Sequence, residues 1–268
     1  MALKQHSAFL TTPPLWTNTQ FGIQQFDFPE MDLTGFKAEP IPMKIRLGHQ
    51  MEYVFKQLIA HSGKYEVLLH NLPIKKDNRT IGEIDFILRE VLTEKRIHVE
   101  LTYKFYIIDP EISEPIHRLM GPNKRDMFFT KIEKIKNEQF ELLHSEEGAK
   151  ALYDKEIEHS EIEHEACYKA QLFIPYGSTL ANIRPLNKNC ICGHWLRFDE
   201  FNSNEFKSHQ FYIPYKSEWV MAPHAAVHWS SHHETLLEVN LSMHMENAPM
   251  VWMKKSETEF EKFFVVFW

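Results

Sequence analysis

The sequence contains little cysteine, little glycine and no long apolar run. Its 268 residues include only 3 cysteines and 9 glycines. Three cysteines are too few for a disulfide framework, and so little glycine excludes a collagen-like or linker-rich chain. The longest wholly apolar stretch, Phe263 to Trp268, is far shorter than the roughly 20 residues needed to span a bilayer. We therefore expect a protein without a membrane span.

Charge and composition are those of an ordinary globular protein. The first residues, MALKQHSAFLTT, lack the apolar run of a signal peptide, so we expect a cytoplasmic protein. The net charge of −7 is local, because residues 141–165 hold nine acidic residues against two lysines. Residues 96–136 hold eight Lys and Arg against six Asp and Glu, a net of +2. A phosphate ligand is electrostatically permitted there.

Periodicity predicts an α/β fold with a mixed sheet. Residues 1–43 are spotted with proline and aromatic residues, which favours an extended N-terminal arm. Residues 44–176 predict a core in the order α-β-β-β-α-β, and residues 177–268 a β-rich extension packed on that core as one domain. The expected core elements are a helix from Leu47 to about Ser62, strands at 65–72, 80–89 and 97–108, a helix with Asn123 as N-cap, and a strand at 168–176. In the extension, strands are expected at 210–214, 218–221, 235–243 and 263–268.

Two carboxylates stand opposite apolar strand positions. Asp85 alternates with Ile84 and Phe86, and Glu100 lies on the polar face of the most regular strand, 97–108. If the two strands pair as a hairpin across residues 90–95, Asp85 and Glu100 come together. Magnesium prefers such oxygen ligands, at about 2.0 to 2.1 Å. Glu52, at the margin of the first helix's apolar stripe, is a candidate third ligand.

These residues resemble a known superfamily. Glu52 on a leading helix, Asp85 in GEIDFIL and the string HVELTYKFYIID resemble the core of PD-(D/E)XK nuclease-like proteins. The segments LGHQMEYVFKQLI, GEIDFIL, ELTYKFY and LMGPNKRDMFFTKIEKI together resemble, more closely, the bacterial family called domain of unknown function 1853. The resemblance implies a restriction-endonuclease-like fold and hydrolysis of phosphodiesters in DNA or another nucleic acid. It implies that Asp85 and Glu100 hold Mg²⁺ or Mn²⁺, with Glu52 in support and the carbonyl of Leu101 as a further ligand.

The resemblance also implies a lysine that steers the attacking water. The usual position, two residues after Glu100, holds Thr102, which we assign to substrate binding. Lys104 shares the face of Glu100 but lies roughly 13 Å along the strand, at about 3.3 Å per residue. We rank Lys104 first as the electrostatic catalyst and Lys131, on the second helix, as its substitute. Contacts to substrate phosphates are expected from Lys124, Arg125 and Lys131.

The sequence also allows other roles for these residues. The carboxylates and Lys104 can instead form a solvated polar face with cross-strand salt bridges, or a degenerate site in a non-catalytic module that binds nucleic acid or protein. A zinc protein would use Cys190, Cys192 and His194, or a helical face with His224, His228 and His232 beside Glu234. Residues 156–165 (EIEHSEIEHE) are simplest as a charged helix face.

Overall fold

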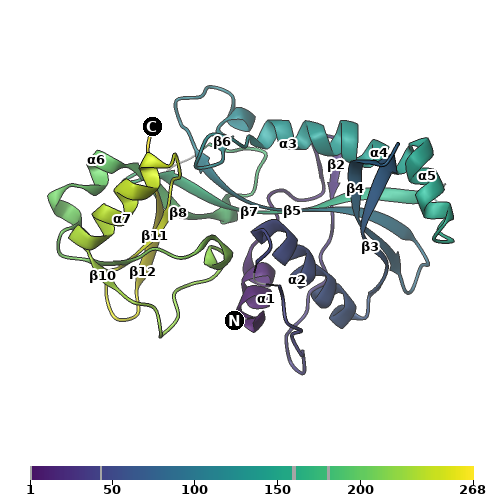
Figure 1. Ribbon diagram of the computed structural model, residues 1–268, viewed down its shortest axis with the longest axis horizontal. Coiled ribbons are helices and arrows are strands. Elements are labelled where there is room, and N and C mark those ends of the chain that lie inside the picture. The colour runs from purple at the N-terminus through teal and green to yellow at the C-terminus, as the bar shows by residue number, and fades with distance from the viewer. Residues whose placement is uncertain (1, 43, 159–160, 180–181) are drawn as a thin grey trace. The chain divides into compact units, whose positions relative to one another are not determined.

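The computed structural model describes residues 2–42, 44–158, 161–179 and 182–268 (Figure 1). It has a mixed α/β architecture with a large sheet of parallel and antiparallel strands, as expected. The chain divides into two compact units, residues 1–103 with 130–169 and residues 104–129 with 170–268. Strands β5 (Arg96–Ile108) and β7 (Ile162–Pro175) contribute residues to both units.

The first unit holds the candidate carboxylates. Its strands β3, β4 and β5 pair antiparallel in that order, while β2 pairs parallel with β7. Its elements are α1 (Ala2–Thr11), β1 (Thr19–Gln20), β2 (Ile23–Gln25), α2 (Leu47–Ser62), β3 (Tyr65–Lys76), β4 (Arg79–Glu90), α4 (Phe140–His144), α5 (Glu146–Tyr153), parts of β5 and β7, and most of α3 (Phe128–Lys134) with the π-helical turn η2 (Ile135–Gln139).

The first helix and the hairpin agree with the sequence prediction. Helix α2 ends at Gly63, whose φ of +64° is the left-handed conformation that glycine adopts readily. Strands β4 and β5 pair from Phe86 opposite Val99 to Arg89 opposite Arg96. The predicted hairpin across residues 90–95 is confirmed.

Helices cover both faces of this hairpin. On one face the ring of Phe55 in α2 lies 4.6 Å from that of Phe86 in β4. On the other, the ring of Phe140 in α4 lies 5.7 Å from the His98 ring in β5. Figure 1 shows α2 on one side of the strands and α4 on the other. In the first unit, β5 is therefore buried on both faces, including the polar face that one of the open alternatives would leave solvated.

The N-terminal segment is not simply extended. Residues 2–11 form helix α1, and Phe9 and Trp16 are fully buried. Trp16 packs against Tyr168, with 5.1 Å between the ring centroids. The aromatic residues of this segment thus belong to the core of the first unit, because burying each ring removes a large apolar area from water.

The second long helix begins later than predicted and is irregular. It starts at Phe128, since residues 121–127 form turns and the Asn123 side chain accepts a hydrogen bond from Ala248 N at 2.7 Å instead of capping a helix. Its middle turn, η2, is π-helical. Such turns are rare and occur frequently at functional sites.

The second unit is built from short strands and helices. Its strands follow the order β10, β9, β11, β12, β8, β7, with β12, β8 and β7 mutually parallel. Its elements are η1 (Pro115–His117), β6 (Leu119–Met120), η3 (Lys188–Cys190), β8 (Ile191–Arg197), α6 (Phe198–Phe201), η4 (Asn204–Phe206), β9 (Gln210–Tyr212), η5 (Lys216–Glu218), β10 (Ser230–Ser231), α7 (His232–His244), β11 (Met250–Lys254) and β12 (Phe260–Val266).

Three further sequence predictions are wrong. Residues 235–243 are helical, because Ser231 and Glu234 form a capping box that starts α7. Residues 218–221 are no strand, since Glu218 Oε2 accepts from Tyr215 N at 3.0 Å and closes the short helix η5. The acidic stretch 156–165 is no helix face, because β7 begins at Ile162, whose side chain is buried. His159 and Ser160 of that stretch lie outside the described residues.

Candidate functional site

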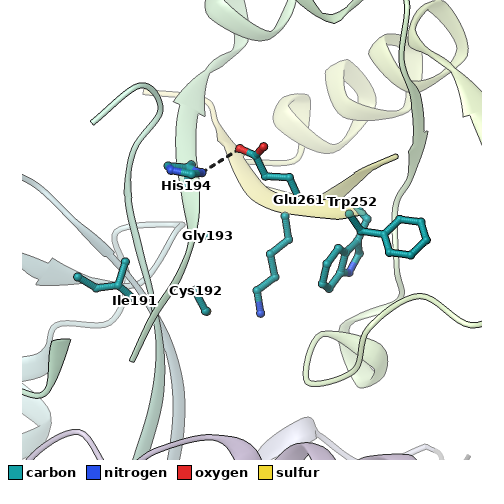
Figure 2. A pocket seen from close by; sticks show the side chains of 8 residues that line it. Ile191, Cys192, Gly193, His194, Trp252 and Glu261 are labelled. Carbon is teal, nitrogen blue, oxygen red and sulfur yellow. Dashed lines mark ion pairs between the residues drawn. The ribbon is translucent and has the colours of Figure 1, made fainter. Parts of the chain in front are cut away.

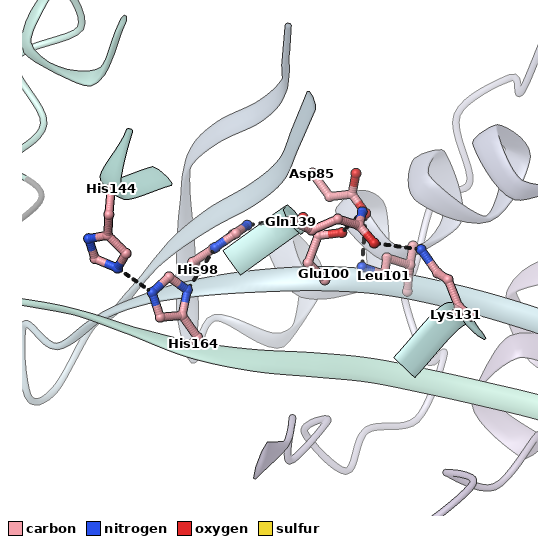
Figure 3. A network of polar contacts seen from close by, with 8 residues as sticks. All are labelled: Asp85, His98, Glu100, Leu101, Lys131, Gln139, His144 and His164. Atoms are coloured by element: carbon pink, nitrogen blue, oxygen red, sulfur yellow. Dashed lines mark hydrogen bonds and ion pairs between the residues drawn. The ribbon is translucent and has the colours of Figure 1, made fainter. Parts of the chain in front are cut away.

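Asp85 and Glu100 are brought together by the pairing of β4 with β5. Phe86 in β4 pairs with Val99 in β5. In the same antiparallel register, the next two residues, Asp85 and Glu100, stand opposite each other. Asp85 Oδ2 accepts a hydrogen bond from the backbone N of Leu101 at 2.9 Å. Figure 3 shows the two carboxyl groups beside each other. We call this pair the carboxylate site.

Glu100 is fully buried and hydrogen-bonded at both oxygens. Its Oε1 lies 3.1 Å from His98 Nε2, and its Oε2 accepts from Gln139 Nε2. Gln139 is the last residue of the π-helical turn η2. The π-helical turn thus places the Gln139 amide where it donates to the Glu100 carboxylate. The apolar spacing of this helix in the sequence did not predict that contact.

Burial changes the protonation of both carboxyl groups. It raises the pKa of Glu100 to about 7, because the charged form loses its hydration, while the Lys131 ammonium opposes this shift. The pKa of Asp85 is raised well above its usual range, mainly by burial and secondly by the negative charge of Glu100. Two carboxylates this close resist ionising together, so added positive charge would stabilise the site.

Lys131 is the lysine whose charge acts on both carboxyl groups. It lowers the pKa of Asp85 and of Glu100, and its Nζ donates to Gln139 Oε1 at 2.7 Å. Figure 3 shows the resulting path from Lys131 through Gln139 to Glu100. Helix α3 and turn η2 therefore bring one ammonium to the carboxylate site.

Glu52 is a more distant member of this group. It is almost buried on α2, and it interacts with His49 Nδ1 at 3.0 Å and accepts from Asn71 Nδ2 at 2.6 Å. Its charge contributes to the raised pKa of Asp85. It also raises the pKa of His49. Glu52 thus adds negative charge to the site while its oxygens are held by two neighbours.

The donor set is compatible with magnesium. In the described part of the chain, no group of three or more His, Cys, Asp or Glu side chains is arranged to hold a metal ion. Magnesium, however, is commonly bound by one or two carboxylates with water and substrate phosphate oxygens. A carboxylate oxygen that accepts one hydrogen bond keeps a second lone pair. Asp85 is partly buried, Glu100 is fully buried and the pKa of both is raised, so this pair of carboxyl groups fits such a cation.

Four further residues were predicted for the site. Thr102 is buried, and its hydroxyl makes no hydrogen bond within the described residues. Lys104, Lys124 and Arg125 belong to the second unit. There Lys104 Nζ donates to Asp126 Oδ2 at 2.6 Å. Lys124 Nζ lies 3.6 Å from the centroid of the Trp268 ring, and Arg125 pairs with Glu246 at 3.1 Å.

Three histidines of the first unit were missed by the sequence interpretation. His98 Nδ1 lies 2.9 Å from His164 Nδ1, and His164 Nε2 lies 2.7 Å from His144 Nε2. Burial is the main cause that lowers the pKa of both His98 and His164 to about 3, so these two rings are neutral near pH 7. The only sequence signal was that His98 shares the strand face of Glu100.

The cysteine and histidine residues near 190 form no zinc arrangement. Cys192 Sγ donates to Gln171 Oε1 at 3.7 Å, and His194 Nδ1 lies 3.0 Å from Glu261 Oε1. Figure 2 shows that His194 turns toward Glu261 and away from Cys192, in a hollow of about 490 Å³ within the second unit. The two side chains therefore do not converge on one point.

The three histidines near 228 share no helical face. Residues 222–229 are irregular, and α7 begins only at His232. His232 is buried, and its Nε2 lies 2.8 Å from the carbonyl of Phe201. Glu234 caps the helix through Ser231. The predicted alignment of His224, His228 and His232 is wrong because the chain between them is not helical.

The raised pKa of Glu100 predicts a pH-dependent stability. The unfolded chain loses this proton near pH 4.5, whereas the folded protein holds it up to about pH 7. The unfolded state therefore binds fewer protons in that window, and the free energy of unfolding falls as pH rises through it. Replacing Glu100→Gln removes this loss. The free energy of unfolding of both proteins is measured by urea unfolding with a chelator present. We expect the difference, variant minus wild type, to be about 2 kcal/mol larger at pH 8 than at pH 5. An unchanged difference between the two pH values would contradict the assignment.

A family model matches nearly the whole chain. The model of the family described as Domain of unknown function (DUF1853) matches residues 6–266. No curated protein and no solved structure matches the chain. Among the described residues, no helix is long and apolar enough to cross a membrane.

Proposed function

From the premise that the chain belongs to the DUF1853 family, we propose that it is a metal-dependent nuclease-like enzyme that hydrolyses phosphodiester bonds in DNA or another nucleic acid. The observation that carries the proposal is the carboxylate site, where partly buried Asp85 and fully buried Glu100 meet on paired strands. The pKa of both carboxyl groups is raised, so a bound cation would stabilise their charged forms. The resemblance of GEIDFIL and HVELTYKFYIID to PD-(D/E)XK nuclease-like proteins supports the same reaction.

Asp85 and Glu100 would hold Mg²⁺ or Mn²⁺, with the Leu101 carbonyl as a further ligand. When bound, the ion would polarise the phosphoryl oxygen and lower the pKa of a bound water. The chain's own contribution is to keep the two carboxylates adjacent. Leu101 N donates to Asp85, and Gln139 Nε2 donates to Glu100, so neither side chain rotates freely. Glu52 adds negative charge from α2, which favours binding of a cation.

We assign electrostatic catalysis to Lys131 in place of Lys104. Negative charge develops on the phosphate in the transition state, and an ammonium held nearby stabilises it. Lys131 acts on both carboxyl groups and is oriented by its bond to Gln139. Lys104 instead donates to Asp126. In this proposal, Lys131 of α3 takes the role of electrostatic catalyst that the sequence pattern gave to Lys104 of β5.

A non-catalytic module that binds nucleic acid is the second candidate. Burial of Thr102 at the usual lysine position, together with the pairing of Lys104 with Asp126, favours it. Binding of DNA without any cleavage would support this function. Cleavage that depends on a divalent ion would exclude it.

The test is a titration of the purified full-length chain with Mg²⁺ and Mn²⁺, followed by cleavage assays. Labelled single-stranded, duplex and branched DNA and single-stranded RNA are incubated with the protein, with Mg²⁺ or with a chelator. We expect binding of one of the ions and cleavage of at least one substrate that the chelator abolishes. A protein that binds neither ion would overturn the proposal.

A further inference from the structure

Three histidines form a continuous chain that leads from the protein surface to Glu100. His98 is fully buried, His164 is half-buried and His144 is exposed. Successive contacts measure 3.1 Å from Glu100 Oε1 to His98 Nε2, 2.9 Å between the Nδ1 atoms of His98 and His164, and 2.7 Å between the Nε2 atoms of His164 and His144. The chain can be followed in Figure 3.

The chain is assembled by three separate elements. His98 comes from β5, His144 ends α4, and His164 lies in β7. The ring of Phe140 packs against two of them, with centroids 5.7 Å from His98 and 4.8 Å from His164. This packing restricts both imidazoles, so that each ring nitrogen faces one partner.

Hydrogen-bond accounting determines where the protons lie. A neutral imidazole has one N–H donor and one acceptor nitrogen. An ionised Glu100 can only accept, so His98 must carry its proton on Nε2. His98 Nδ1 then accepts from His164 Nδ1–H, and His164 Nε2 accepts from His144 Nε2–H. One carboxylate thereby sets the tautomers of three histidines, and the histidines in turn set the direction of the bond to the carboxylate.

We infer that His98, His164 and His144 are positioning residues for Glu100, which lock His98 as the Nε2–H tautomer and hold the carboxylate in its orientation toward a divalent cation. This inference rests on the proposed function. Without His164, His98 could carry its proton on Nδ1, and its Nε2 lone pair would then face the Glu100 oxygen. Two acceptors repel, so the carboxylate would turn away. Residues that orient metal ligands in this manner commonly contribute about 10-fold to 100-fold to metal affinity.

The first test measures Mn²⁺ affinity by calorimetry. We expect His164→Leu to bind Mn²⁺ about 10-fold to 100-fold more weakly than the wild type. His164→Gln keeps an N–H donor and an acceptor, and we expect it to restore the affinity to within about threefold of the wild type. His244→Leu, an exposed histidine in the second unit, is the matched control and should leave the affinity unchanged. Thermal unfolding of each variant shows whether it folds.

The second test reads the tautomers directly. In long-range ¹H–¹⁵N spectra of the wild type with Mg²⁺ at pH 8.5, we expect the proton of His98 on Nε2 and that of His164 on Nδ1. A wild type that binds no Mn²⁺ overturns the proposed function and this inference with it. A wild type that binds Mn²⁺ while folded His164→Leu binds equally well, or a His98 protonated on Nδ1, overturns this inference alone.

Discussion

Asp85→Asn and Glu100→Gln each abolish cleavage of nucleic acid that depends on Mg²⁺, with an expected loss of at least about 100-fold in rate. The reason is that each substitution removes one of the two carboxylates that would hold the ion, while the amide keeps the size and shape of the side chain. Mn²⁺ binding should be lost in the same variants. The measurement is single-turnover cleavage with matched calorimetry.

The matched control for this prediction is Glu66→Gln. Glu66 is an exposed carboxylate of the same unit that pairs with Arg89. Exposed pairs of this kind contribute about 0 to 1 kcal/mol to stability, so the variant should fold and cleave like the wild type. Full activity of Asp85→Asn or Glu100→Gln would contradict the assignment of the carboxylate site. Because Glu100→Gln is also expected to stabilise the metal-free protein at pH 8, a loss of its activity could not be attributed to unfolding.

Lys131→Ala is expected to lower the cleavage rate by about 100-fold to 1,000-fold, whereas Lys104→Ala should stay within about threefold of the wild type. The physical reason is the position of each ammonium. Lys131 is half-buried and acts on both Asp85 and Glu100, while Lys104 is paired with Asp126. The effect of Lys131→Ala should fall on kcat rather than on KM, because developing charge on the phosphate exists only in the transition state.

The two lysine variants serve as controls for one another. Each removes one positive charge, so a general change in attraction to nucleic acid would affect both alike. Lys131→Arg keeps the charge and should retain part of the activity. The reverse ranking, with Lys104→Ala inactive and Lys131→Ala active, would return the catalytic role to the strand lysine that the sequence favoured.

Local patterns predicted the elements that carry the carboxylate site. The apolar spacing of α2 and its stop at Gly63, together with the alternation in β4 and β5, correctly indicated a helix followed by an antiparallel hairpin. These features depend on neighbours within a few residues, so periodicity detects them. The prediction failed at 235–243, where we expected a strand and the capping box at Ser231 starts a helix.

The environment of the carboxylates was decided by tertiary contacts. The polar face of β5 is buried rather than solvated because α4 and η2 pack on it. Gln139 reaches Glu100 through a π-helical turn, and Lys131 reaches the site from the preceding helix. Spacing along the chain shows neither the bond of the irregular turn to Glu100 nor the partner of Lys104, since Gln139 lies 39 positions from Glu100 and Asp126 lies 22 positions from Lys104.

By itself, the sequence determined that Asp85 and Glu100 lie on two strands of one hairpin, because strand periodicity and the turn at 90–95 are local. Only the tertiary structure decided that Glu100 is fully buried, that the Lys131 ammonium acts on both carboxyl groups while Lys104 pairs with Asp126, and that His98, His164 and His144 join Glu100 to the surface. Burial and hydrogen bonding between distant elements set protonation, and no pattern of neighbouring residues encodes which elements will meet.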